Sequence, residues 1–173
     1  ACIDGLGALT EGNQVLAMLA ANDLSQKIEG QYQGIYQEIG ESINGVHSQM
    51  VHIVEIANHM AAGNLCDLDG LKAIGQRSDN DTLVPSFISM IESIAMLVAE
   101  TQEMTRIAVD GDLTNRGQVA KFQGEYAKVV EGFNQTLDVV IEPINAASAT
   151  LRELAPGNLH TAMTGDFKGQ HGQ

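Results

Sequence analysis

The sequence contains no tryptophan, only three prolines and only 4% aromatic residues. Because 44% of its residues are apolar, any core must be built mainly from Leu, Ile, Val, Met and Ala. Such a composition suits helices that pack against helices and predicts an all-α protein. Two cysteines, Cys2 and Cys66, are too few for a disulfide framework, so we expect free thiols in a reducing, cytoplasmic setting.

Positive charge is also scarce, with 9 Lys and Arg against 22 Asp and Glu and a net charge of −13. A chain this acidic repels phosphate backbones and anionic lipids, which argues against nucleic acids and membrane surfaces as partners. No apolar run approaches the roughly 18–20 residues that span a bilayer. We therefore expect no direct membrane contact. Asp4 and the nearby glycines interrupt the start, and we expect no signal peptide.

Two stretches of the chain repeat one pattern. Residues 22–44 read NDLSQKIEGQYQGIYQEIGESIN, and residues 111–134 read GDLTNRGQVAKFQGEYAKVVEGFN. Both begin with Asp-Leu, share an aromatic-Gln-Gly-x-Tyr run, and end in Glu-x-apolar-Asn. Internal repetition of this kind predicts successive similar units.

A short phrase ending in leucine recurs four times, as Asn22-Asp23-Leu24, Gly63-Asn64-Leu65, Gly111-Asp112-Leu113 and Gly157-Asn158-Leu159. Gly or Asn directly after a helix accepts the left-handed conformation of a C-terminal cap, so each phrase predicts a helix end. We expect the leucines to anchor the following connector, together with a second apolar residue such as Ile28 or Met163. The third connector has Gly117 at that position, where Val119 is the substitute. In the second connector Leu68 or Leu71 takes this role.

Long helical stretches with apolar residues at alternating steps of three and four follow each connector. We call the line of these apolar residues along one face of each helix the seam. It comprises Ile39, Ile43, Val46, Met50 and Ile53, then Leu83, Phe87, Met90, Ile94 and Leu97, then Val130, Phe133, Leu137, Val140 and Ile144. A period of 3.5 sustained over three to four heptads is typical of coiled coils. A leading helix carries Leu9, Leu16 and Leu19, and Pro143 should kink the last long helix at a joint between units.

The connectors predict that the two helices of a unit are parallel. About twelve residues lie between Asn22 and Gly34, and they span about 40 Å when extended, more than the roughly 24 Å length of a 16-residue helix. The connector can therefore return along its helix, whereas antiparallel neighbours need only about 2–8 residues. If only two helices pack together, most of the apolar side chains in their two seams remain in contact with water. A second copy of the chain, parallel to the first, would close a four-helix bundle and cover it.

These residues resemble the HAMP domain of bacterial receptors and sensor kinases. Glu38-Ile39-Gly40 and DTLVPSFISM (81–90) look like the family's acidic-apolar opening of the second helix. The QYQGIY and KFQGEY phrases are similar to tandem HAMP arrays of methyl-accepting chemotaxis proteins. The resemblance covers HAMP-like units at 6–54, 51–100 and 100–148, and the start of a fourth at 147–173.

The resemblance implies a non-catalytic module that relays conformational change between a sensor and an output domain through bistable four-helix bundles. It implies a homodimer in the cytoplasm, or in the cytoplasmic part of a membrane receptor. We expect an excerpt of a longer polypeptide, with flanking input and output domains. The alternative is a passive coiled-coil dimerisation spacer that does not switch.

No pattern in the sequence predicts catalysis or a cofactor. His52 and His59 lie seven residues apart beside the seam, with Glu55 within a turn of both. They lack the paired Glu-x-x-His spacing of di-metal bundles, and we expect solvated histidines and no metal. Cys66 is expected to be a small buried residue. No nucleophile and base can be paired, so the protein is predicted not to be an enzyme.

Overall fold

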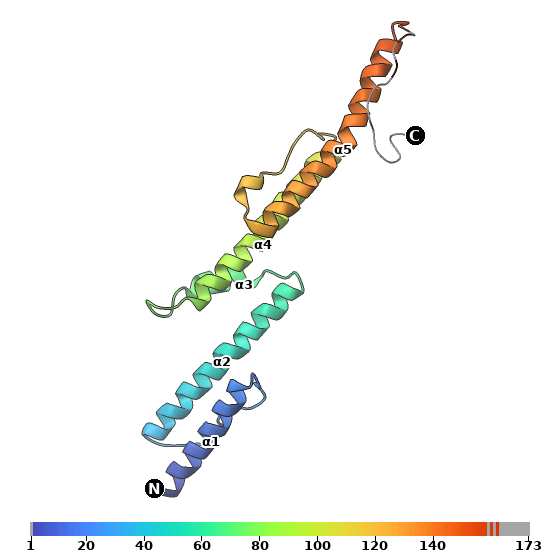
Figure 1. Cartoon of the computed structure of the whole chain (residues 1–173). Coiled ribbons are helices and arrows are strands. Elements are labelled where there is room, and N and C mark those ends of the chain that lie inside the picture. The colour runs from blue at the N-terminus through green and yellow to red at the C-terminus, as the bar shows by residue number, and fades with distance from the viewer. Residues whose placement is uncertain (1, 159, 161, 163–173) are drawn as a thin grey trace. The chain divides into compact units, whose positions relative to one another are not determined.

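The computed structural model describes residues 2–158, 160 and 162, and every regular element in this part of the chain is helical. The elements are α1 (Cys2–Ala20), α2 (Ile35–Ala61), α3 (Asp67–Ile74), α4 (Leu83–Val109), the 3₁₀ turn η1 (Val119–Lys121) and α5 (Gly124–Leu154) (Figure 1). The predicted all-α class is thus confirmed. The chain divides into two compact units, here called the N-terminal unit (residues 1–75) and the C-terminal unit (residues 76–173).

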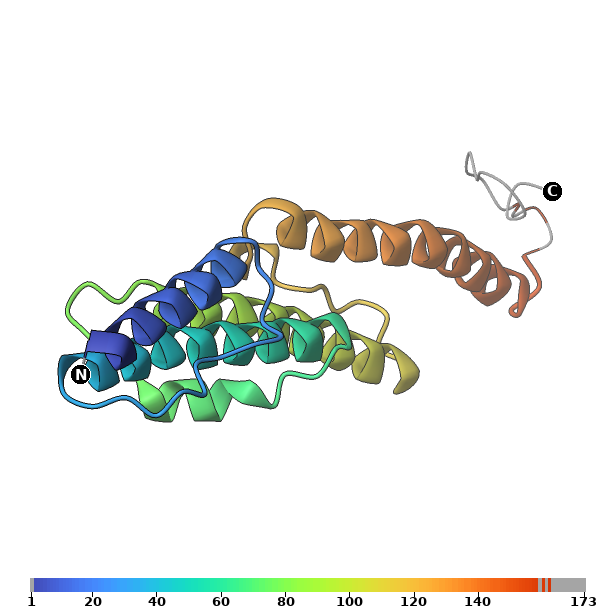
Figure 2. The same ribbon diagram turned by 90° about the horizontal axis from the view of Figure 1, so that it is seen from below.

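In the N-terminal unit, α1 and α2 lie side by side and run in the same direction (Figures 1 and 2). Gly5, near the start of α1, is so close to Tyr36 that an added Cβ would lie 2.7 Å from the tyrosine Oη. About two turns further along, Gly12 faces Ile43 in the same register, since both pairs are 31 residues apart in the sequence. The connector, residues 21–34, returns along both helices, which is why a long connector gives parallel neighbours.

The core of the N-terminal unit is small and lies between these three segments. Its buried members are Val15, Leu19, Ile28 and Ile43, with Leu24, Tyr32 and Met50 packed against them. α1, the connector and α2 all contribute to it. The connector is therefore a third layer of the unit and not a loose linker.

The C-terminal unit repeats this construction with α4, a connector of residues 110–123 that contains η1, and α5. Its core consists of the buried residues Met104, Phe122 and Val130, and of Leu97, Val119, Ala127 and Leu137 packed against them. The connector again runs back along the first helix, because Gln118 and Lys121 bond to Glu100, nine residues before the helix ends at Val109. The two helices of this unit are parallel as well (Figure 1).

All four residues predicted to follow a helix end have positive φ angles, namely 59° for Asn22, 74° for Gly63, 92° for Gly111 and 96° for Gly157. In the first three phrases the next residue donates its backbone N–H to a carbonyl five residues earlier, as in a Schellman motif. These bonds are Asp23 to Met18 (2.9 Å), Asn64 to His59 (2.8 Å) and Asp112 to Ile107 (3.1 Å).

The second residue of these three phrases, Asp23, Asn64 or Asp112, also bonds through its side chain. Its Oδ1 accepts the backbone N–H two residues on, from Ser25 (3.0 Å), Cys66 (3.1 Å) and Thr114 (2.9 Å) respectively. This Asx turn sends the chain away from the helix axis. The recurring phrase is therefore explained residue by residue, since the first position supplies the left-handed cap and the second forms the turn.

The segment between α2 and α4 differs from a plain connector. It contains the eight-residue helix α3, whose Leu71 is buried, while Leu68 is half-buried. The boundary between the two compact units lies directly after α3, between Gly75 and Gln76. The predicted boundaries 6–54, 51–100, 100–148 and 147–173 stay predictions.

Helix α5 continues through Pro143 without interruption, and the proline side chain is buried. The proline removes one backbone donor from the helix interior. The expected joint at this position is therefore not a break in the helix.

Helix α4 is the one helix in the described part of the chain that is long and apolar enough to cross a membrane, with a mean hydropathy of 1.6. This helix is not a continuous apolar run in the sequence, because Glu92 and several polar residues interrupt it. Length and composition alone are weak evidence for a span, since core helices of soluble proteins meet the same criteria. Met104 of α4 is in the core of the C-terminal unit.

We predict opposite effects for two glycines that lie seven residues apart. Gly63→Ala should destabilise the protein by about 1–2 kcal/mol, because a Cβ is disfavoured at its φ of 74°. Gly70→Ala, inside α3, should stabilise it by about 0.5–1 kcal/mol. Neither new Cβ would meet another atom within 4 Å, so the difference comes from the backbone. Chemical denaturation measures both, and equal effects would contradict the cap assignment.

Candidate functional site

Each connector is attached to the second helix of its unit by one asparagine side chain. Asn44 Oδ1 accepts the N–H of Ile28 (2.8 Å), and its Nδ2 donates to the carbonyl of the same residue (2.9 Å). Asn134 forms the same pair with Gly117, at 2.8 and 3.0 Å. The side-chain amide thus accepts an N–H for which the irregular connector provides no backbone acceptor, and it donates to the carbonyl of the same residue.

A glutamate attaches each connector to the first helix of its unit. Glu11 Oε1 accepts the N–H groups of Glu29 (2.9 Å) and Gly30 (3.3 Å), and its Oε2 accepts the hydroxyl of Tyr32. In the C-terminal unit, Glu100 accepts the N–H of Gln118 (2.8 Å) and the ammonium of Lys121 (3.0 Å).

These bonds favour the ionised form of both carboxylates. The Tyr32 hydroxyl, followed by the Glu29 N–H, lowers the pKa of Glu11 below its ordinary value. The Gln118 N–H, followed by Lys121, lowers the pKa of Glu100. Both carboxylates therefore remain ionised at neutral pH.

The carbonyls of the anchor residues Leu24 and Leu113 also have side-chain partners. His47 Nε2 lies 3.0 Å from the carbonyl oxygen of Leu24, and Arg116 Nη1 donates to that of Leu113 at 2.7 Å. Arg116 also bonds to Asp138 of α5, with Nε 2.9 Å from Oδ1. The connector of the C-terminal unit is thereby tied to α5 at a second point.

The predicted apolar anchors occupy different environments in the two units. Leu24 packs against the core of the N-terminal unit, and Ile28 is buried within it. Leu113 is half-buried, and Val119, inside η1, packs against the core of the C-terminal unit. Leu65 is half-buried, whereas Leu159 and Met163 lie outside the described residues.

Gly117 explains why the third connector has no apolar residue at the second anchor position. A Cβ at this residue would lie 2.5 Å from Met104 Sδ and 2.6 Å from Val130 Cγ1. The glycine lets the connector backbone contact the core directly. Val119 then supplies the apolar side chain that the glycine lacks.

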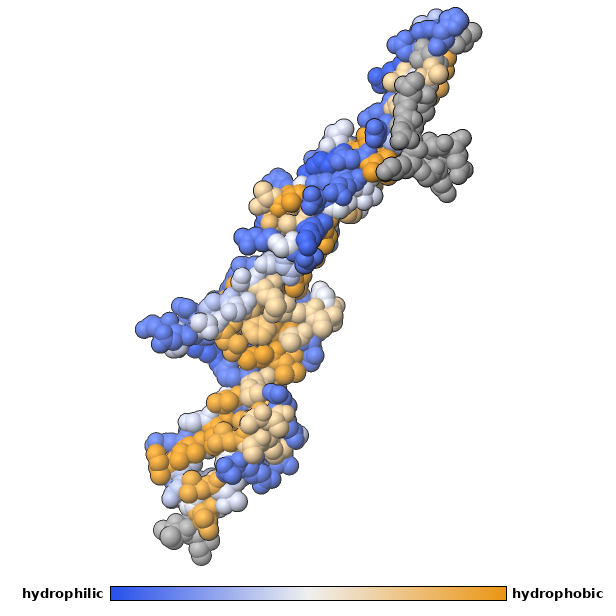
Figure 3. All heavy atoms as spheres, viewed as in Figure 1, coloured by the Kyte–Doolittle hydropathy of each residue, from blue (hydrophilic) through white to orange (hydrophobic). Residues whose placement is uncertain are grey.

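Only part of the predicted seam is covered within one chain. Ile43 and Val130 are buried, and the half-buried members are Met50, Ile53, Phe87, Ile94, Leu97 and Leu137. The exposed members are Ile39, Val46, Leu83, Met90, Phe133, Val140 and Ile144. Figure 3 shows apolar side chains on the surface of both units.

The exposed members have a regular spacing. Leu9 and Leu16 of α1, Ile39 and Val46 of α2, and Phe133 and Val140 of α5 form pairs that are each one heptad apart, and all six are exposed. Buried Val15 lies on another face of α1, whereas buried Ile43 lies beside Ile39 and Val46 along one edge of the same apolar face of α2. The helices therefore bury part of their apolar surface inside the unit, and a single chain leaves the other part uncovered.

The asparagine and glutamate attachments were not predicted from the sequence. Asn44 and Asn134 were visible as the last residues of the repeated pattern, but nothing local assigned them a partner. Glu11 and Glu100 lie 18 residues before the N–H groups they bind, outside the repeated stretch. Cys66, expected to be buried, is exposed at the start of α3. His52 and Glu55 form an exposed pair at 3.8 Å.

Residues 121–173 match the model of the HAMP domain family. A HAMP domain is thus found at the C-terminal end of the chain, and it includes all of α5. HAMP domains are signal-relay linkers of bacterial sensor receptors and lie in their cytoplasmic region, between input and output domains. The match does not cover residues 1–120. No curated protein and no solved structure matches the chain significantly.

We predict that Asn134→Ala destabilises the C-terminal unit by about 1–3 kcal/mol, because it leaves the N–H of Gly117 without a partner and removes one of the two donors to its carbonyl. Amide hydrogens of residues 111–123 should then exchange faster, as measured by mass spectrometry. Gln135→Ala, at the exposed neighbouring position, is the control and should change stability by less than about 0.5 kcal/mol. Unchanged exchange in the Asn134 variant would show that the amide does not hold the connector.

Proposed function

We propose that the chain is a tandem array of HAMP domains that relays conformational change in a bacterial receptor. The family match at residues 121–173 supports a role in signal relay. The repeated construction supports extension of the array toward the N-terminus, because Asn44 and Asn134 hold their connectors in the same way. The three identical helix ends at Asp23, Asn64 and Asp112 support it further.

The working form in this proposal is a parallel homodimer. The observation that carries it is the exposed apolar face with heptad spacing on α1, α2 and α5. Covering one Leu or Ile side chain contributes about 1.5–3 kcal/mol, so leaving the whole face in water would be costly. A second copy with the same direction brings identical heptad positions together and closes a four-helix bundle in each unit.

Relay requires two packings of this bundle that differ by only a few kcal/mol. Several features favour such a balance over maximal rigidity. Gly40, Gly45 and Gly132 lie inside long helices, where each costs about 0.5–1 kcal/mol relative to alanine. Thr101 interrupts the seam of α4, and its hydroxyl bonds to carbonyls of its own helix.

In the proposed setting the module carries out no catalysis and needs no cofactor. It acts in the cytoplasm between input and output domains of the same polypeptide, as in a chemotaxis receptor or a related sensor. A passive dimerisation spacer is the alternative, and the many polar attachments of the connectors favour it, because they stiffen each unit.

Two adjacent valines of α5 test the dimer. Val140 belongs to the predicted seam and Val139 does not, while both are exposed in the single chain, by 38% and 61%. We expect Val140→Glu to convert the protein to monomers at micromolar concentration, because it places two carboxylates in the bundle core. Val139→Glu should remain dimeric. Light scattering decides this, and a monomeric unmodified protein or equal effects of the two variants would contradict the seam.

Graded substitutions in one connector separate relay from spacer. Leu113→Val and Leu113→Ala, and Gly111→Ala, would be placed in the full-length receptor and its output measured. We expect some variants to lock the output high and others to lock it low, by at least threefold. The exposed Asn115→Ala is the control and should have no effect. A loss of output that only follows loss of stability would favour the spacer.

A further inference from the structure

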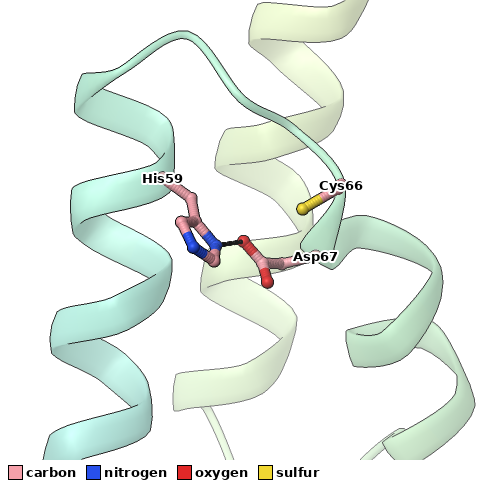
Figure 4. A group of neighbouring side chains, drawn as sticks. All are labelled: His59, Cys66 and Asp67. Carbon is pink, nitrogen blue, oxygen red and sulfur yellow. Dashed lines mark hydrogen bonds and ion pairs between the residues drawn. The ribbon is translucent and has the colours of Figure 1, made fainter.

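We infer that His59, Cys66 and Asp67 form a binding site for a transition-metal ion of the Zn²⁺ class. Each residue offers one ligand atom, and these atoms all lie within 4.8 Å of one another (Figure 4). From the sequence we considered His59 together with His52 and Glu55 and expected no metal. The inference is independent of the relay proposal, because it rests on the geometry of the N-terminal unit alone.

The helix end at Gly63 brings the three residues together. His59 is in the last turn of α2, and its carbonyl accepts the N–H of Asn64 at 2.8 Å. The side chain of Asn64 in turn accepts the N–H of Cys66 at 3.1 Å. Asp67 is the first residue of α3. The backbone positions of the ligands are thus fixed by hydrogen bonds that involve none of their own side chains.

The side chains are close to the arrangement that a metal needs. His59 Nδ1 lies 2.8 Å from Asp67 Oδ2. Tetrahedral coordination with metal–nitrogen and metal–oxygen distances of about 2.0–2.2 Å places these two atoms about 3.3–3.6 Å apart, so they must separate by roughly half an ångström. The Sγ of Cys66, which lies within 4.8 Å of both, must move closer to them by about 1 Å, which a rotation of its exposed side chain can supply. Cys66 is exposed, and the side chains of His59 and Asp67 are 46% and 19% exposed, so an ion can reach the site.

The ligand set selects the class of ion. One thiolate, one imidazole and one carboxylate suit Zn²⁺ and Co²⁺, whereas Mg²⁺ and Ca²⁺ prefer oxygen ligands throughout. Three protein ligands leave a fourth position for water or another ligand. The net charge of −13 adds a long-range attraction for cations.

A bound ion would link the last turn of α2 to the first turn of α3 across the turn at Gly63. This is the only one of the three described Asx-turn phrases in which His, Cys and Asp surround the turn. Metal binding would therefore act on this helix end and leave those at Asn22 and Gly111 unaffected.

Titration of the full chain with Co²⁺, under reducing and oxygen-free conditions, tests the site. Thiolate coordination gives a charge-transfer band in the near ultraviolet. We expect it to saturate at one Co²⁺ per chain and to be reversed by Zn²⁺. Cys66→Ser should abolish the band, and His59→Gln and Asp67→Asn should each weaken binding at least tenfold. Far-ultraviolet circular dichroism verifies that the variants remain helical.

Two variants serve as matched controls. Cys2→Ser removes the other thiol, and His52→Gln removes the other histidine of α2 that pairs with a carboxylate. Both should keep the band and the affinity of the unmodified chain. Absence of a stoichiometric band would overturn the inference. So would a band that persists in Cys66→Ser or disappears in Cys2→Ser.

Discussion

A connector that returns along its own helix carries about a dozen peptide groups outside any helix or sheet, and each needs a hydrogen-bond partner. In both units one asparagine from the second helix and one glutamate from the first bond to the peptide groups in the middle of the connector. These side chains hold the connector against two parallel helices. The small core, the anchor residues and the direction of the chain all depend on this attachment.

The attachment also determines which apolar residues remain uncovered. In α1, Val15 and Leu19 are buried next to the connector and α2, whereas Leu9 and Leu16 on another face are exposed. The same division occurs in α5 between Val130 and Val140. A single seam in the sequence therefore becomes two surfaces in the folded chain, one internal and one external.

Much of this architecture could be predicted from the sequence because it depends on local chemistry. Gly63 and Gly111 mark helix ends through their backbone freedom, and the heptad spacing marks the apolar faces. The length of the connectors predicted parallel helices, as the structure has them.

Other features depend on contacts between distant residues. No local pattern links Glu100 to the N–H of Gln118, or shows that Gly117 must be small to fit between Met104 and Val130. Cys66 was expected to be buried because it follows an anchor leucine. The unexpected helix α3 begins directly after it and leaves the thiol exposed, next to His59.

The two polar attachments of the C-terminal connector have a mechanical consequence. Asn134 of α5 holds Gly117, and Glu100 of α4 holds the very next residue, Gln118. Two adjacent residues of the connector thus link α4 to α5. Axial sliding of α4 past α5 by one helical turn, about 5.4 Å, would therefore break at least one of the two sets of bonds.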